Sequence, residues 1–203
     1  MIYGDISGRD RELLYLPIVH TQVDMGSLGT SIAGAKASAI GQSGAARAAA
    51  RVQRLWDEIE SFLNKLPDNL QSVRVYQDGL AVCGRETEIV TELAEAGSRN
   101  YALLLKLQAR GAVLMGTESP ELLVEEYRLA LAAFAPGAVA GRGKDRLRDS
   151  LLDRRDRFIA ERIDQTLLAG ETAILLIGML HKIGRWLPPG IAVHYPLAGS
   201  SGK

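Results

Sequence analysis

Hydrophobic positions along the chain fall into short continuous runs that are separated by longer stretches with helical spacing. Apolar runs of four to eight residues are typical of buried strands. They predict strands over 14–20, 72–77, 112–115, 173–180 and 191–195. Between them, apolar residues three or four positions apart predict four helical stretches. These cover about 20 residues after Gly44, then 85–110, a stretch beginning at Ser119-Pro120-Glu121, and 145–169.

This order alternates strand and helix. It predicts one α/β domain over 1–203, with a mainly parallel sheet of about five strands and helices on both faces. Gly97-Ser98 is expected to split the 85–110 helix, and Pro-Gly-Ala-Val-Ala-Gly-Arg-Gly-Lys at 136–144 is the expected flexible loop. Pro17 conflicts with a central strand, because proline lacks the backbone donor. Either the first strand begins after Pro17 or it lies at an edge.

Composition narrows the class of protein. The chain has 203 residues, with 24 basic and 24 acidic side chains, so no net field attracts nucleic acid or an anionic membrane. Cys83 is the lone cysteine, which excludes an internal disulfide and fits a reducing compartment. There is no signal-peptide pattern at the N-terminus, and the longest apolar run, 173–180, is far too short to span a membrane. We therefore expect a soluble, cytoplasmic protein that binds neither nucleic acid nor membrane.

Four predicted strands end at a potentially reactive side chain: His20, Asp78, Glu118 and His181. Parallel strands bring such ends to one side of the sheet, where ligands of α/β proteins bind. Two imidazoles with one or two carboxylates suit a divalent transition metal that keeps a position open for water. We predict His20, Glu118 and His181 as metal ligands, and Asp78 as a further ligand or general base.

Each of these residues also has a structural interpretation. A histidine after an apolar strand is often only the polar end of a buried segment, which applies to both His20 and His181. Asp78 is followed by glycine and fits a turn. Glu118 could instead favour the positive N-terminus of the helix that follows it. The glycine-rich loop 24–34 matches no phosphate-binding pattern and is expected to border the site.

The long charged helix contains an arginine on its apolar side. Arg155 falls between Leu151 and Ile159 in a stripe of leucines and isoleucines with four-residue steps, and Arg162 shares its face about 10 Å further along. A buried guanidinium needs a partner. We predict that Arg155 or Arg162 holds a strand-end carboxylate or an anionic or carbonyl group of a substrate. The alternative is an arginine that lays its stem on the core and keeps its head in water.

The run 154–164, Arg-Arg-Asp-Arg-Phe-Ile-Ala-Glu-Arg-Ile-Asp, and the strand end Gly178-Met-Leu-His181 resemble the later half of a known superfamily. It contains the TraB/TIKI-type metalloproteases, the erythromycin-esterase-like enzymes and the ChaN-like haem-binding proteins. Its members pair an arginine-bearing helix with a Gly-x-x-His strand end and place another histidine after the first strand. The resemblance covers about 30 residues plus a few around His20, where Pro17 stands in place of the expected glycine. It implies a shared cleft and, in some members, metal-dependent hydrolysis.

The sequence therefore predicts a metal-dependent hydrolase that uses a divalent transition metal at the carboxyl ends of the strands, with a small molecule or peptide as substrate. The alternative is a non-catalytic module that binds a small ligand, such as haem or a nucleotide, or docks a protein partner. An oligomer is compatible with either function.

Overall fold

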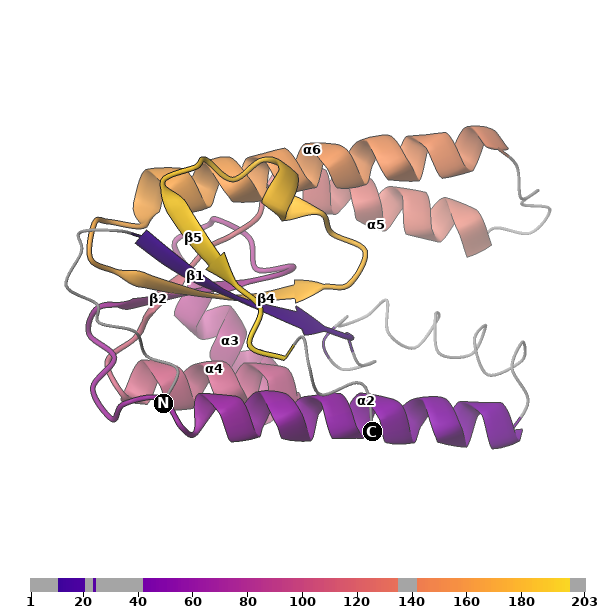
Figure 1. Cartoon of the computed structure of the whole chain (residues 1–203). Helices are drawn as coiled ribbons and strands as arrows, with labels where there is room; N and C mark the ends of the chain where they lie inside the picture. Colours follow the sequence, from indigo (N-terminus) through magenta and orange to yellow (C-terminus); the bar gives the residue numbers. More distant parts are fainter. Residues whose placement is uncertain (1–10, 21–23, 25–41, 135–141, 198–203) are drawn as a thin grey trace.

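In a computed structural model, which describes residues 11–20, 24, 42–134 and 142–197, five parallel strands form one sheet (Figure 1). The strand order is β3-β2-β4-β1-β5. The strands are β1 (Arg11–Ile18), β2 (Val73–Gln77), β3 (Val113–Met115), β4 (Thr172–Gly178) and β5 (Ile191–His194). The predicted α/β class, the parallel sheet and its five strands are confirmed.

Helices cover both faces of the sheet, as Figure 1 shows. One face carries α2 (Gln42–Leu63), α3 (Glu86–Glu95) and α4 (Arg99–Ala109). The other carries α6 (Arg142–Thr166), which packs against α5 (Pro120–Phe134), and the short 3-10 turn η1 (Ile183–Arg185). None of the helices in the described ranges is long and apolar enough to cross a membrane.

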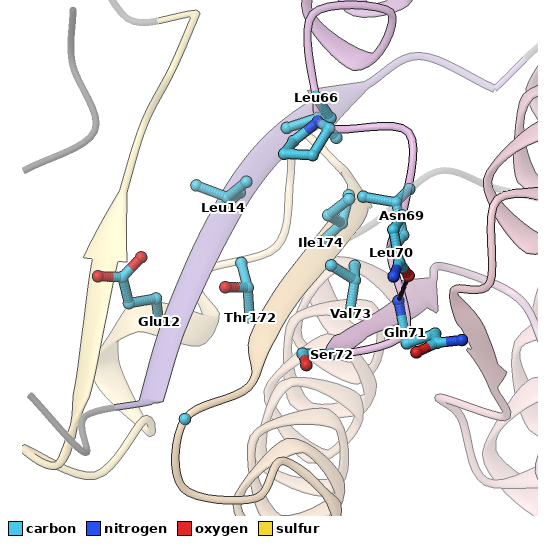
Figure 2. A pocket seen from close by; sticks show the side chains of 12 residues that line it. Glu12, Leu14, Leu66, Asn69, Leu70, Gln71, Ser72, Val73, Thr172 and Ile174 are labelled. Carbon is cyan, nitrogen blue, oxygen red and sulfur yellow. Dashed lines mark hydrogen bonds between the residues drawn. The ribbon is translucent and has the colours of Figure 1, made fainter. Parts of the chain in front are cut away.

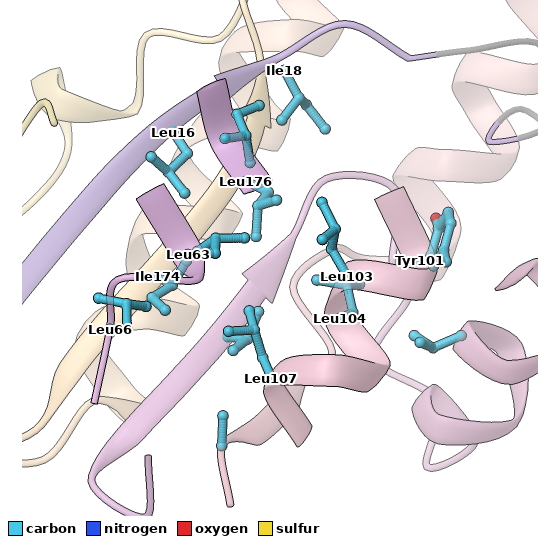
Figure 3. Close-up of a cluster of buried hydrophobic side chains, with 14 of the residues drawn as sticks. Leu16, Ile18, Leu63, Leu66, Tyr101, Leu103, Leu104, Leu107, Ile174 and Leu176 are labelled. Carbon is cyan, nitrogen blue, oxygen red and sulfur yellow. The ribbon is translucent and has the colours of Figure 1, made fainter. Parts of the chain in front are cut away.

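The alternation of side chains along each strand divides the core into two layers. On β1, Leu16 and Ile18 pack toward α2 and α4 (Figure 3), whereas Leu13 and Tyr15 face α6. All seven residues of β4 are buried or partly buried, because this strand lies at the centre of the sheet. Continuous apolar runs therefore mark strands that are covered on both faces.

Local signals in the sequence end the helices where expected. Gly97 has φ +94°, and Ser98 then caps α4 by accepting a hydrogen bond from the Tyr101 amide. Gly111 follows α4 with φ +100°, a conformation that favours glycine. Ser119 caps α5 through the Leu122 amide. These contacts confirm the predicted break at Gly97-Ser98 and the predicted start of α5.

Other predicted boundaries were wrong. The chain leaves β1 at Ile18 and β4 at Gly178, so His20 and His181 lie two and three residues beyond their strands. Helix α6 begins at Arg142, inside the expected loop 136–144, of which 136–141 lies outside the described residues. Leu147 belongs to the predicted apolar stripe but is 57% exposed, because α6 extends past the sheet there (Figure 1).

Pro17 lies within an interior strand, which neither sequence interpretation anticipated. It pairs with Ile177 of β4, while the pairing of β1 with β5 ends at Leu14. On the β5 side, Pro17 thus has no strand partner among the described residues. Because no strand pairs with Pro17 on that side, the absence of its backbone N–H interrupts no hydrogen bond of the sheet there.

Candidate metal-binding site

The carboxyl ends of the strands bring together a buried group of acidic and histidine side chains. Asp78 directly follows β2, Glu118 lies three residues after β3 in a bridge to Ala81, and His181 follows β4. One ligand atom from each of Asp78, Glu118 and His181 lies within 4.8 Å of the others, and all three residues are buried. The ligand atoms of one bound transition metal are about 3–4 Å apart. This group could therefore hold a metal ion after a small contraction.

Both histidines point at the same oxygen of Asp78. His20 Nε2 lies 2.9 Å from Asp78 Oδ2, and His181 Nε2 lies 3.5 Å from it. The backbone amide of Gly178 donates to this oxygen as well, at 2.8 Å. The structure therefore brings His20 and His181 to one place, although 160 positions separate them in the sequence. Asp78 is a buried contact for both rings, which a simple turn residue would not be.

Asp156 orients the second histidine from the opposite side. Its Oδ1 lies 2.6 Å from His181 Nδ1, and its Oδ2 accepts the backbone amide of Lys182 at 2.8 Å. The Tyr15 hydroxyl donates to the His181 carbonyl at 3.4 Å. A carboxylate on one ring nitrogen directs the other nitrogen toward the site, which is the usual arrangement behind a metal-bound histidine. Nε2 of His181 is therefore the nitrogen available for chemistry.

Arg155 is buried and binds the carboxylates at the strand ends, as its place in the apolar stripe predicted. Its Nε donates to Glu118 Oε2 at 2.9 Å, and its Nη2 donates to Glu118 Oε1 at 2.5 Å. Nη2 also reaches Asp78 Oδ1 at 2.9 Å, and Nη1 reaches Glu126 Oε1 at 2.6 Å. The guanidinium thus joins α6 to the ends of β2 and β3 and to α5. The interpretation with the head group in water was wrong.

Burial and hydrogen bonding shift the titration of these groups. For His181, burial lowers the pKa, but the contacts with Asp156 and Asp78 outweigh it and raise the pKa to about 9. The pKa of His20 is also raised, since Asp78 outweighs burial. Burial raises the pKa of Asp78, yet the two histidines hold it well below its ordinary value. Without a metal, the site at neutral pH is a carboxylate facing at least one imidazolium.

Glu118 and Arg155 form a tightly coupled pair beside this centre. Burial raises the pKa of Glu118, against the opposing effect of the guanidinium. The pKa of Arg155 is raised above its already high value, because its carboxylate partners outweigh burial. Both oxygens of Glu118 accept from Arg155, and Oε1 also accepts the Gly79 amide at 3.2 Å. Three hydrogen bonds thus fix the carboxylate of Glu118.

Gly178 allows the carboxylate of Asp78 to lie close to the backbone. A Cβ atom at this position would lie 2.8 Å from Asp78 Oδ2, which is closer than real Cβ contacts permit, and 3.7 Å from His20 Nε2. Any side chain here would push the carboxylate away from the histidines. The glycine of the Gly-x-x-His pattern is thus explained by the close approach of Asp78.

The sequence interpretation placed some residues differently and missed others. The Nε of Arg162 donates to the Gly116 carbonyl at 3.1 Å, so among the described residues it binds the backbone after β3 and not a strand-end side chain. Asp156 and Glu126 were not predicted. Asp156 could have been found, because it precedes Ile159 by three and Ile163 by seven positions and so shares their buried face. Of the predicted loop 24–34, only Asp24 is described; it accepts a hydrogen bond from Ser98.

A separate cavity of about 340 Å³ opens at the opposite, amino-terminal edge of the sheet (Figure 2). Its floor is apolar, with Leu14, Val73 and Ile174, and Glu12 is the charged residue in its lining. A cavity without a group of reactive side chains offers binding space but no chemistry. The residues that carry chemistry are at the carboxyl edge.

Together, the fold and the site define an α/β protein with a buried acidic and histidine centre that could bind a metal. No family model, curated protein or solved structure matches this chain. The assignment to this class of protein therefore rests on the fold and on the geometry of the site.

Proposed function

We propose that the protein is a metal-dependent hydrolase in which His20, Asp78 and His181 bind one divalent transition metal. The observation that carries this proposal is the convergence of two Nε2 atoms on one buried carboxylate oxygen, at 2.9 and 3.5 Å. Two imidazoles and one carboxylate form a common ligand set of catalytic zinc sites, which leave the fourth position to water.

The charges of the site favour a cation. Three carboxylates are buried at the site: Asp78, Glu118 and Asp156. Arg155, the one buried arginine in the described part of the chain, pairs with the first two, whereas Asp156 pairs with His181. Without a metal, the balance of charge depends on protons held by the two histidines. A divalent ion would replace those protons, and its binding would release them to solvent.

Glu118, predicted as a ligand, belongs with Asp78 and His181 to the group that could hold a metal, and we propose that it acts mainly in support of the other ligands. Both of its oxygens are occupied by Arg155, whereas Asp78 Oδ2 faces the two histidines. In this arrangement Glu118 fixes Arg155, and Arg155 fixes the other oxygen of Asp78. Glu118→Gln should therefore weaken metal binding far less than Asp78→Asn.

A bound metal would lower the pKa of its water toward 7 and so supply hydroxide at neutral pH. The protein would provide orientation and charge. Asp156 holds the ring of His181, and the Nη1 of Arg155 is paired with Glu126, whose side chain is 49% exposed. A carbonyl oxygen of a small molecule or peptide substrate could take the place of this exposed carboxylate on Arg155.

The resemblance to the TraB/TIKI-type, erythromycin-esterase-like and ChaN-like superfamily is part of the proposal. It is supported by the contact of Arg155 and His181 with the same residue, Asp78. The alternative function, a non-catalytic module for haem, a nucleotide or a protein partner, gains no specific support from the described residues.

The test is hydrolysis by metal-stripped protein reloaded with Zn²⁺, Mn²⁺ or Co²⁺ and offered a panel of activated esters and fluorogenic peptides. We expect activity that chelation removes and metal restores, with a loss of at least about 100-fold in His181→Ala and Asp78→Asn. His194→Ala is the matched control, since this exposed histidine on β5 belongs to no contact of the site. Activity that is indifferent to metal, or equal loss in His194→Ala, would contradict the proposal.

A further inference from the structure

A second cavity lies between α5 and α6, next to the proposed metal site. Its volume is about 310 Å³, near the lower limit for small-molecule pockets. Its wall combines an apolar part with four charged side chains, Glu126, Arg148, Asp149 and Arg155. The apolar part consists of Leu129, Ala130, Leu151, Leu152 and Leu180.

Two residues that line this cavity also adjoin the site. Arg155 contacts Asp78 through Nη2 and Glu126, at the cavity, through Nη1. Leu180 directly precedes His181 and lines the cavity from the other side. A group bound at Arg155 and the metal would therefore lie beside this partly apolar space.

The turn that joins β4 to His181 exposes two large apolar side chains. Met179 is 63% exposed and Leu180 is 77% exposed, although both follow a fully covered strand. The turn is closed by the His181 amide, which donates to the Gly178 carbonyl at 3.1 Å. Its shape is therefore set by the same residues that build the site. Exposed apolar side chains beside a reactive centre favour an apolar ligand.

We propose that the cavity between α5 and α6 binds an apolar group of the substrate, a linear alkyl or aromatic group attached to the carbonyl that is hydrolysed. This inference rests on the proposed hydrolase function and adds the class of substrate. The cavity is large enough for one such group, which would contact its four leucines and Ala130.

The test uses Co²⁺-loaded protein and a series of neutral metal-binding probes, the alkyl hydroxamic acids from acetohydroxamic to octanohydroxamic acid. Binding is followed by the visible spectrum of the cobalt ion. We expect the Kd to fall roughly threefold to fourfold for each added methylene until the cavity is full. Ala130→Phe should fill the cavity and abolish this dependence while the affinity for acetohydroxamic acid is kept.

Two further variants make the result specific. Ala132→Phe, at an exposed position on α5, is the matched control and should bind the series as the natural chain does. Leu180→Asp changes an exposed wall residue without touching the core, and it should also flatten the dependence on chain length. A series with equal affinities in the natural chain, or one unaffected by both Ala130→Phe and Leu180→Asp, would overturn the inference.

Failure of the metal site can be separated from failure of the cavity. In metal-free protein, hexan-1-ol should shift the methyl NMR signals of Leu129 and Leu152, and Ala130→Phe should abolish those shifts. If cobalt does not bind but these shifts occur, the hydrolase proposal fails and the apolar cavity stands. If cobalt binds and hexan-1-ol leaves both leucines unchanged, the cavity proposal fails alone.

Discussion

At the scale of single residues, Asp78 is the residue that both histidines and Arg155 contact. One of its oxygens faces His20, His181 and the amide of Gly178, while the other faces Arg155. A buried carboxylate is stable only when its charge and lone pairs are satisfied. Each partner therefore contributes both to folding and to the geometry of the site.

Gly178→Ala should disrupt the site through a single methyl group. The added Cβ would lie 2.8 Å from Asp78 Oδ2, so the carboxylate must move. We expect a loss of about 1–3 kcal/mol in the free energy of unfolding and at least a tenfold loss of metal affinity. Urea denaturation and metal titration measure the two effects.

The control for this substitution is Gly143→Ala, at an exposed position in α6 where an added Cβ meets nothing within 4 Å. Alanine there should leave stability unchanged or raise it by up to about 1 kcal/mol. If Gly178→Ala behaves like Gly143→Ala, the close approach of Asp78 does not explain this glycine.

The pKa of His181 predicts how stability depends on pH in the metal-free protein. Because the folded pKa is raised to about 9 from an unfolded value near 6.5, the imidazolium stabilises the fold fully below about pH 6.5. That contribution, up to about 3 kcal/mol, is lost as the pH rises through 9. Asp156→Asn removes one charge partner and should flatten this loss, as urea denaturation at pH 6–9 would show.

The informative quantity is the difference in unfolding free energy between the natural chain and Asp156→Asn at each pH. Other groups titrate in the same range and contribute equally to both proteins. Parallel profiles for the natural chain and Asp156→Asn would mean that the Asp156–His181 contact does not hold the proton. At acidic pH the sign reverses for Asp78, whose lowered pKa adds stability that is lost as the pH falls toward that pKa.

At the scale of elements, α6 connects the parts of the site. Its consecutive residues Arg155 and Asp156 contact different strand ends, the first reaching Asp78 and Glu118 and the second reaching His181. Successive helical positions are about 100° apart, so the two side chains diverge from one turn of helix. The position of α6 thus determines whether the ends of β2, β3 and β4 form one site.

Arg155→Met should show how much the contacts of Arg155 with Asp78 and Glu118 contribute to stability. It leaves two buried carboxylates without their guanidinium, and we expect a loss of about 3–5 kcal/mol in the free energy of unfolding. Adding Glu118→Gln should recover part of this loss, because it removes one uncompensated charge. Both variants can be compared by urea denaturation.

The neighbouring Arg154→Met is a matched control. Arg154 pairs with Glu125 at the surface, where both side chains are about half exposed, so its removal should cost less than about 1 kcal/mol. Equal losses from Arg154→Met and Arg155→Met would contradict the buried role of Arg155.

The elements were largely predictable from the sequence, and their ends were less so. Runs of apolar residues located all five strands, and Ser98 and Gly111 marked helix ends through their own backbone preferences. The strand over 173–180 was drawn too long, because Met179 and Leu180 are apolar yet exposed. Hydrophobicity alone cannot distinguish a buried strand residue from an apolar residue at the edge of a site.

At the scale of the whole molecule, the order of the strands creates the site. Four adjacent strands, β3-β2-β4-β1, are followed by Glu118, Asp78, His181 and His20 in that order. Parallel direction could be predicted from the alternation of strand and helix, and it places these residues at one edge. The order could not be predicted, because no local pattern states which strands pair. The convergence of both histidines on Asp78 therefore emerged only from the fold.

Binding of a divalent transition metal by His20, Asp78 and His181, as proposed, should depend on pH. The metal affinity should rise with pH up to about 9, since His181 must lose its proton to bind. Isothermal titration in buffers of different ionisation enthalpy should detect at least about one proton released for each metal ion at pH 7.

The most direct measurement is the metal content of the purified chain after dialysis against Zn²⁺, Mn²⁺ or Co²⁺, compared with His181→Ala and His194→Ala. We expect about one equivalent of at least one of these metals in the natural chain and in His194→Ala, and a large loss in His181→Ala. Less than about 0.1 equivalent of every metal in the natural chain, or equal content in all three proteins, would contradict the claim.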